Sequence, residues 1–378
     1  MFDYEVLRFI WWVLIGVLMI GFIITDGFDM GVGALLRILG KSETERRVMI
    51  NSIAPHWDGN QVWLITAGGA LFAAWPLVYA TSFSGFFFAM ILTLGALWMR
   101  PLSLEYRAKG ETDKWRNVCD WGITISGFVP PLIFGVAFGN LLQGVPFQLN
   151  EFLMPTYHGS FFGLLNPFAI LAGLVSVFMV LTQGATWLQM KTTAELEQRS
   201  RSAAQLCALL TTVTFVLAGI WVQNIDGYVI TSVIDTNAAS NPVAKEVVRE
   251  AGAWMKNFQD YPILWLAPAL GVVMPLLTIV ASRAKKGGLA FLTSSLAIAG
   301  VILTAGFAMF PFIMPSDLSP SDSLTMWDST SSELTLNIMT GVAFVFVPII
   351  LCYTAFCYYK MFGRLDTKYI EDNKNSLY

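Results

Sequence analysis

Two aspartates stand inside the first long apolar stretch of the chain. Asp26 and Asp29 are three residues apart, so on a helix they share one face. Placing an ionised Asp near the centre of a bilayer costs roughly 2.5–3.5 kcal/mol, and such residues normally face a bundle interior or water. A carboxyl group in that setting can bind and release protons. We therefore expect Asp29 and Asp26 to have a function, with a structural polar contact or a helix end as the alternative, above all for Asp26.

A second polar cluster, residues 51–63, leads into the next apolar stretch. Asp58 would lie near the start of a helix, where the helix dipole favours an anion. His56 titrates near neutral pH and could shuttle protons. Taken singly, each side chain could be a cap or an interfacial group. Together with Asp26 and Asp29 on the same side of the membrane, they predict a proton-conducting polar pocket.

Other polar side chains have simpler structural interpretations. Arg100 and Asp120 end the third and begin the fourth apolar stretch, and we expect a structural ion pair there. Trp57 is expected to be structural at the same membrane boundary, because tryptophan is enriched at bilayer interfaces. Gly27 and Gly31 form a small-xxx-small pair that permits close helix packing.

Composition and apolar stretches define the fold class. The chain is 55% hydrophobic and 13% charged, whereas soluble proteins are roughly 45–50% apolar and about 25% charged. Spans of about 20 apolar residues cross a bilayer as helices. We therefore expect an all-α polytopic membrane protein with nine transmembrane helices in one bundle, at approximately 9–36, 60–79, 81–100, 121–142, 161–188, 204–223, 262–282, 289–311 and 336–360.

Basic residues predict the orientation, because Lys and Arg near span ends are retained in the cytoplasm. With the amino terminus in the periplasm and the carboxyl terminus in the cytoplasm, the basic residues left outside are Arg8, Lys245, Arg249 and Lys256. The outer loops at about 143–160 and 312–335 contain no Lys or Arg.

The domain organisation is expected to be simple. Residues 1–378 should form a single transmembrane domain, with a long periplasmic loop at about 224–261. In that loop, residues 243–258 are expected to form a short amphipathic helix.

Several function classes find no support in the sequence. The net charge of -3 carries no electrostatic footprint for nucleic acid. The four cysteines have no metal-binding spacing and are interpreted as core residues. His56 and His158 are expected on opposite membrane sides, so they could not bind one haem together. A transporter, a channel and a subunit of a redox complex remain compatible with the acidic pocket.

Five segments resemble subunit II of cytochrome bd ubiquinol oxidases, the subunit without haem. They are GFDMGVG at 27–33, PHWDGNQVWL at 55–64, FVPPLIFGVAFGN at 128–140, TQGAT at 182–186 and FCYYKMFGR at 356–364. The resemblance extends over essentially the whole chain and is close to the enterobacterial type.

The resemblance implies a bacterial inner-membrane complex that oxidises ubiquinol, reduces dioxygen to water and contributes to the proton motive force. It implies a larger partner, subunit I, that holds haem b and haem d, and small single-span accessory subunits, all in contact with membrane lipid. It also implies a proton path through Asp58 and the Asp29 region, oxygen access near Trp63, and a structural ubiquinone in this chain.

Two rivals to this function stay open from the sequence. In the first, a secondary transporter binds a coupling ion at Asp26, Asp29 and Asp58, since broken helices with polar groups at the bilayer midplane mark that class. In the second, the chain only stabilises a haem-bearing partner, and its acidic side chains are structural contacts.

Overall fold

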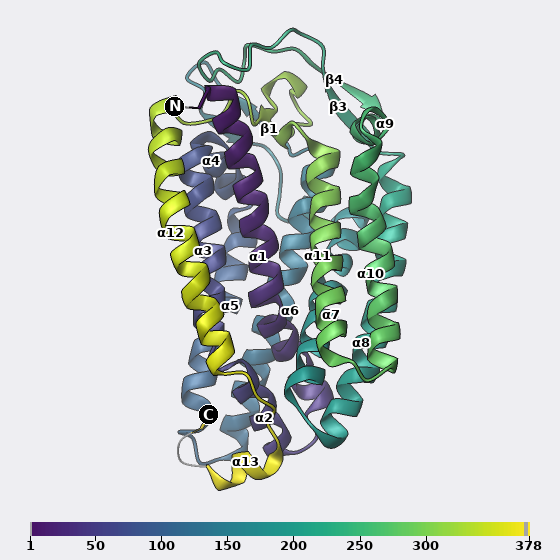
Figure 1. Cartoon of the computed structure of the whole chain (residues 1–378). Coiled ribbons are helices and arrows are strands. Elements are labelled where there is room, and N and C mark those ends of the chain that lie inside the picture. The colour runs from purple at the N-terminus through teal and green to yellow at the C-terminus, as the bar shows by residue number, and fades with distance from the viewer. Residues whose placement is uncertain (1, 374–376) are drawn as a thin grey trace.

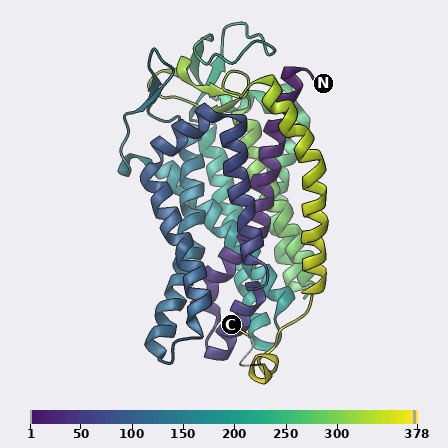
Figure 2. The same cartoon turned by 90° about the vertical axis from the view of Figure 1, so that its left-hand side faces the viewer.

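A computed structural model describes residues 2–373 and 377–378. The described chain forms an elongated helical bundle whose long helices run along one axis (Figures 1 and 2). Among the described residues, eight helices are long and apolar enough to cross a membrane. They are α1 (Tyr4–Leu39), α5 (Phe87–Arg107), α6 (Asp113–Gln143), α7 (Pro167–Lys191), α8 (Ala194–Val222), α10 (Leu266–Arg283, preceded by the 3-10 turn η3, Pro262–Trp265), α11 (Gly287–Met309) and α12 (Glu333–Lys360).

The expected span at 60–79 is divided in the structure. Helix α3 (Trp57–Ala74) ends at Trp75, and α4 (Pro76–Gly85) follows. Proline has no backbone N–H and disfavours a helical conformation of the residue before it. Trp75 accordingly has φ -130° and ψ 72°. Helix α3 also begins with polar residues, and it is not one of the eight helices above.

Two ends of the bundle can be distinguished (Figure 1). The α2 end carries α2 (Glu43–Ile53), which begins with a Ser42–Glu45 capping box, and α13 (Thr367–Asp372), which packs on α2. The strand end carries three two-stranded antiparallel sheets, formed by β1 (Phe147–Leu149) with β2 (Pro155–Tyr157), β3 (Asp226–Ile230) with β4 (Val247–Ala251), and β5 (Phe312–Met314) with β6 (Leu324–Thr325). Short helical turns η1 (Phe162–Leu164), η2 (Ala253–Met255), η4 (Pro320–Asp322) and α9 (Lys256–Asp260) complete its loops.

The prediction of an amphipathic helix at 243–258 was wrong for most of this range. Residues 247–251 form β4, which pairs with β3 in a register that places Arg249 opposite Tyr228. Gly252 adopts a left-handed conformation (φ 76°), and only after it do the 3-10 turn η2 and then the α-helix α9 begin, the latter at Lys256. Backbone pairing with a strand that lies earlier in the chain overrode the local helical periodicity.

Helix α1 passes through the bundle and packs on α6 and α7 through glycines. A Cβ atom at Gly31 would lie 2.2 Å from the Val180 carbonyl oxygen, and one at Gly184 would lie 2.4 Å from the Gly31 carbonyl carbon. A Cβ at Gly127 of α6 would lie 2.2 Å from the Met30 oxygen. The close contact expected of Gly31 is therefore present, with Gly184 as its partner. Gly27 is different, because a Cβ there would make only ordinary contacts.

Helix α12 lies at the outside of the bundle beside α1 and α3 (Figures 1 and 2). Its buried residues are Leu336 and Thr340, near the strand end. Large apolar side chains are exposed along the rest of the helix, as expected of a surface that faces lipid or another membrane chain.

Candidate functional site

Asp26 and Asp29 lie on the face of α1 that points into the bundle. The two residues are 0% and 1% exposed. Helices α5 and α3 supply their polar partners. Nearby, Gly31 fixes α1 against α7, and Gly127 of α6 fixes α6 against α1. The two carboxyl groups therefore share a buried environment, but their partners differ.

Asp26 forms a buried ion pair with Arg100 of α5. One guanidinium nitrogen of Arg100 donates to Asp26 Oδ1, and Nη2 lies 3.4 Å from Oδ2. The side chains are 1% and 0% exposed. Because the guanidinium stays charged in proteins, this carboxylate has a fixed counter-ion.

Asp29 lacks such a counter-ion within the described part of the chain. Its Oδ2 accepts a hydrogen bond of 2.8 Å from Asn60 Nδ2 on α3. Its Oδ1 is buried and has no hydrogen-bond partner among the described residues. A buried polar atom without a partner is rare and marks a place for water or for an exchangeable proton.

Asn60 connects Asp29 to Tyr358 of α12 through a second hydrogen bond. Tyr358 Oη donates a hydrogen bond of 2.6 Å to Asn60 Oδ1. The Tyr358 ring stacks on the His56 ring with a centroid distance of 4.4 Å and an interplanar angle of 6°. We predicted no individual role for Asn60 or Tyr358 from the sequence. Asn60 could have been noticed because it is an amide in the first turn of an apolar helix. The local sequence contains no comparable indication that Tyr358 has a role.

The remaining residues of the 51–63 cluster occupy different settings. His56 is 5% exposed, and burial together with the charge of Lys191 lowers its pKa from 6.5 to about 4. Asp58 is exposed on the first turn of α3, two residues before Asn60. Trp57 is half-buried and packs against the core cluster that contains Phe28.

Trp63 lies farther along α3 and packs against α1. A Cβ atom at Gly21 would lie 2.5 Å from a ring carbon of Trp63. The indole is half-buried beside the core cluster that contains Phe22 and Met30. Trp63 therefore occupies the contact between α1 and α3, and Gly21 makes room for it.

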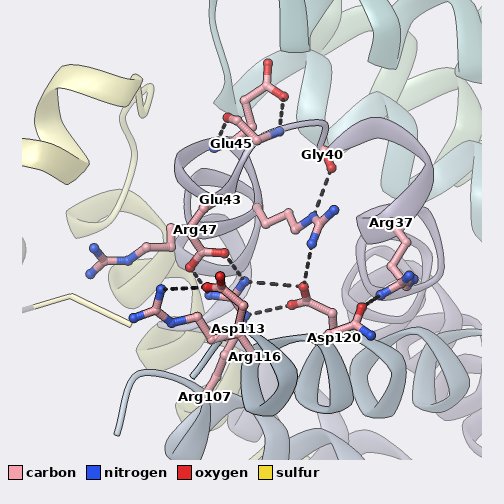
Figure 3. Close-up of polar contacts among 12 residues, drawn as sticks. Arg37, Gly40, Glu43, Glu45, Arg47, Arg107, Asp113, Arg116 and Asp120 are labelled. Carbon is pink, nitrogen blue, oxygen red and sulfur yellow. Dashed lines mark hydrogen bonds and ion pairs between the residues drawn. The ribbon is translucent and has the colours of Figure 1, made fainter. Parts of the chain in front are cut away.

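Arg100 and Asp120 do not form the ion pair that we expected between them. Arg100 pairs with Asp26, whereas Asp120 lies between Arg46 (2.9 Å) and Arg107 (2.7 Å) at the α2 end (Figure 3). Both residues nevertheless have the structural ion pairs that their types predicted. Their partners differ because α2 folds back onto α5 and α6 and brings its own arginine to Asp120.

Glu43 of α2 extends this cluster of charged residues (Figure 3). Both of its oxygens accept 2.8 Å hydrogen bonds from Arg107. Partial burial raises the pKa of Glu43, but the hydrogen bonds and charge of Arg107 outweigh burial and leave the pKa below its usual value. The cluster ties α2 to the ends of α5 and α6.

The two histidines lie far apart in the fold. His56 follows α2 at one end of the bundle, and His158 follows β2 at the other. A haem iron that needs two axial ligands would therefore find no histidine pair in this chain. An apolar cavity of about 550 Å³ lies beside Tyr358, lined by Ile24, Thr25, Phe28, Trp187, Met190, Phe291, Tyr358, Tyr359 and Phe362.

The fold and the buried carboxyl groups define the general class of protein. The described residues form eight membrane-length helices with buried acidic side chains between them, as a multi-pass membrane protein does. The profile of a family described as cytochrome bd terminal oxidase subunit II matches residues 7–361. The chain therefore belongs to the cytochrome bd terminal oxidase subunit II family, and its relatives are subunits of an oxidoreductase complex.

Individual relatives agree with this assignment. The chain is 66% identical over its full length to cytochrome bd-I ubiquinol oxidase subunit 2 of Escherichia coli K12, whose full length is also covered. It is 31% identical to cytochrome bd ubiquinol oxidase subunit 2 of Bacillus subtilis, with 95% of this chain and 97% of the relative covered. The structure of bd oxidase from Geobacillus thermodenitrificans has a chain with the same fold, with a TM-score of 0.69, 15% identity, and coverage of 95% of this chain and 100% of that one.

Proposed function

We propose that this chain supports the haem-bearing subunit I of a cytochrome bd ubiquinol oxidase and carries protons toward it from the cytoplasm. The observation that carries the proposal is the contrast between two buried carboxyl groups on one helix. Asp26 is neutralised by Arg100, whereas Asp29 has an oxygen without a partner among the described residues. A group that exchanges protons must be able to change charge, and Asp29 is the one that has no fixed counter-ion.

Each residue of the path has a separate role in this proposal. Asp58 is exposed near the α2 end and collects protons. Asp29 receives them inside the bundle and passes them on toward subunit I. Asp26 with Arg100 holds a neutral pair beside Asp29 and does not exchange protons itself. His56 is neutral at pH 7 because its pKa is lowered to about 4, so it does not carry a charge in the path and instead packs against Tyr358 beside it.

The α2 end is proposed to face the cytoplasm. This end carries α2 and the ends of α5 and α6, whose basic residues include Arg46, Arg107 and Arg116. Basic residues near span ends are retained on the cytoplasmic side. The assignment requires α3 to cross as the ninth span, so that the amino terminus is periplasmic, the carboxyl terminus cytoplasmic and residues 224–261 a periplasmic loop of a single transmembrane domain.

The other expectations for the complex remain part of the proposal. Subunit I holds haem b and haem d, which supply the site where electrons from ubiquinol reach dioxygen. The half-buried Trp63 lies at the α1–α3 contact and is proposed to border the access route of oxygen. A structural ubiquinone, small single-span accessory subunits, contact with membrane lipid and the bacterial inner membrane follow from the family resemblance.

Substitution of the two candidate acids tests the proton path. Asp29→Asn and Asp58→Asn, each in a normally assembled complex, should slow ubiquinol-driven oxygen consumption. Asp113→Asn is the matched control, because this aspartate is fully exposed at the start of α6. Normal turnover in both candidate variants would favour the rival in which the chain is only a scaffold. Slow turnover caused by lost assembly is recognised from the haem spectrum of the purified complex.

The oxidase assignment itself has an independent test. The chain is purified through a tag, and a reduced-minus-oxidised spectrum is recorded. A haem-bearing partner should copurify, and this chain expressed alone should show no haem spectrum. A preparation without a haem partner that transports an ion would instead identify the transporter.

A further inference from the structure

Tyr358 is a polar side chain that faces inward from the α2-end half of α12, a helix that is otherwise largely exposed. Its neighbours on α12, Phe356 and Tyr359, are 57% and 76% exposed. Tyr358 instead turns toward α1 and α3 and reaches Asn60. The α2-end half of α12 is thus connected to the buried acids through one phenol.

The orientation of the Asn60 amide follows from its two partners. A carboxylate only accepts hydrogen bonds, so the amide nitrogen must face Asp29 Oδ2, at 2.8 Å. The amide oxygen then faces Tyr358, whose hydroxyl donates to it at 2.6 Å. A phenol donates a hydrogen bond more strongly than it accepts one, so the hydroxyl favours the amide orientation that presents a donor to Asp29.

The surroundings of Tyr358 are aromatic and apolar. His56 stacks on its ring, the rings of Phe28 and Trp187 contact it edge-on with centroids 6.3 Å away, and the apolar cavity of about 550 Å³ lies beside it. The titratable and charged groups near it are His56, Asp29 behind Asn60, the Asp26–Arg100 pair, and Lys191, whose Nζ lies 5.0 Å from the Trp187 ring centre. Asn60 is therefore the polar group to which its hydroxyl donates.

We propose that Tyr358 is a positioning residue for proton transfer at Asp29, acting through Asn60. The inference rests on the proposed proton path. With Asn60 held in place, an arriving proton binds Asp29 Oδ1 and later leaves to the next acceptor, and no other bond changes. Without the hydroxyl this preference is lost, so the Asn60 amide turns its oxygen toward Asp29 more readily, accepts a hydrogen bond from the protonated carboxyl group and makes Asp29 retain its proton.

The test is Tyr358→Phe in the assembled two-subunit complex, with Tyr359→Phe as the control that removes a neighbouring exposed hydroxyl. Ubiquinol-driven oxygen consumption is measured from low to high pH. We expect Tyr358→Phe to lower turnover about fivefold, the factor that corresponds to the loss of one hydrogen bond. The loss should be larger at low pH, because retention of the proton then dominates, so the pH profile moves to higher pH. A merely structural role would lower turnover equally at every pH.

Two further variants separate this inference from the proposed function. Asn60→Leu removes the amide that accepts the Tyr358 hydrogen bond, and it must reproduce the loss of turnover. This variant keeps the test decisive if the Tyr358→Phe complex fails to assemble. In an Asp29→Asn background, Tyr358→Phe should cause no further loss. If Asp29→Asn has slow turnover and Tyr358→Phe has normal turnover, the role of Tyr358 is wrong but the proton path stands. Additive losses of turnover in the double variant would have the same meaning. Normal turnover of Asp29→Asn would overturn the proton path at Asp29, and the inference with it.

Discussion

Arg100 of α5 pairs with Asp26 of α1, 74 positions earlier in the chain, and both side chains are buried. The pair joins two membrane-length helices at the level of the candidate proton site. An ion pair in a dry interior is costly to break, because the partner that remains is a buried charge without compensation. The pair therefore fixes α5 beside the acidic face of α1.

The first prediction concerns this pair. Arg100→Gln and Asp26→Asn should each destabilise the chain by about 3–5 kcal/mol, the range for removing one partner of a buried ion pair. The double variant should recover part of the loss, because neither charge remains. The yield of assembled complex and its thermal unfolding midpoint measure the effect. Equal losses in the single and double variants would contradict a coupled pair. Arg116→Gln, which breaks an exposed contact with Asp113, is the control.

The second prediction concerns the glycine crossing of α1 and α7. Gly184→Ala should destabilise the bundle by about 1–3 kcal/mol, as overpacking of a tight interior does. The new methyl group would lie 2.4 Å from the Gly31 carbonyl carbon, and backbone atoms cannot move aside cheaply. Gly16→Ala on α1, where a Cβ meets no atom within 4 Å, should be neutral. Similar thermal midpoints for the two variants would show that the crossing is looser than described.

The third prediction is a pH dependence caused by His56. Its pKa is about 4 in the folded chain and 6.5 in an unfolded one, so the unfolded state binds more protons between these values. Stability should therefore fall as pH falls from 6.5 toward 4, by at most about 3 kcal/mol from this group. His56→Phe keeps a ring for stacking on Tyr358 and cannot titrate. Its thermal midpoint should depend less on pH in that window, and an unchanged dependence would assign the effect to other groups.

The fourth prediction ranks two acids of the cluster at the α2 end. Asp120→Asn should cost more stability than Glu43→Gln, because the Asp120 side chain is 0% exposed and the Glu43 side chain is 42% exposed. Solvent screens the Glu43 contact, so its loss should cost roughly 1 kcal/mol or less. Loss of Asp120 leaves the buried Arg107 with Glu43 as its remaining carboxylate partner. Chemical denaturation of the purified complex compares the two, and the reverse order would show that burial does not set their contributions.

Much of the fold could be predicted from the sequence because apolar span length is a local property. Eight of the nine expected stretches correspond to the membrane-length helices of the described residues, whereas the stretch at 60–79 is divided at Trp75 because Pro76 follows. The hairpin of β3 and β4 could not be predicted, because its pairing joins residues about 20 positions apart across an irregular loop. Strand pairing depends on a partner that the local pattern does not reveal.

For the candidate site, the sequence by itself determined the residue types and the helix face that Asp26 and Asp29 share. Carboxyl groups three residues apart in an apolar span had to share a helix face, whatever the helix packed against. Only the tertiary structure decided that Arg100 pairs with Asp26 and not with Asp120, and that Asn60 and Tyr358 lie beside Asp29. These contacts depend on the rotation and crossing of α1, α3, α5 and α12, which are set by packing between side chains far apart in the chain.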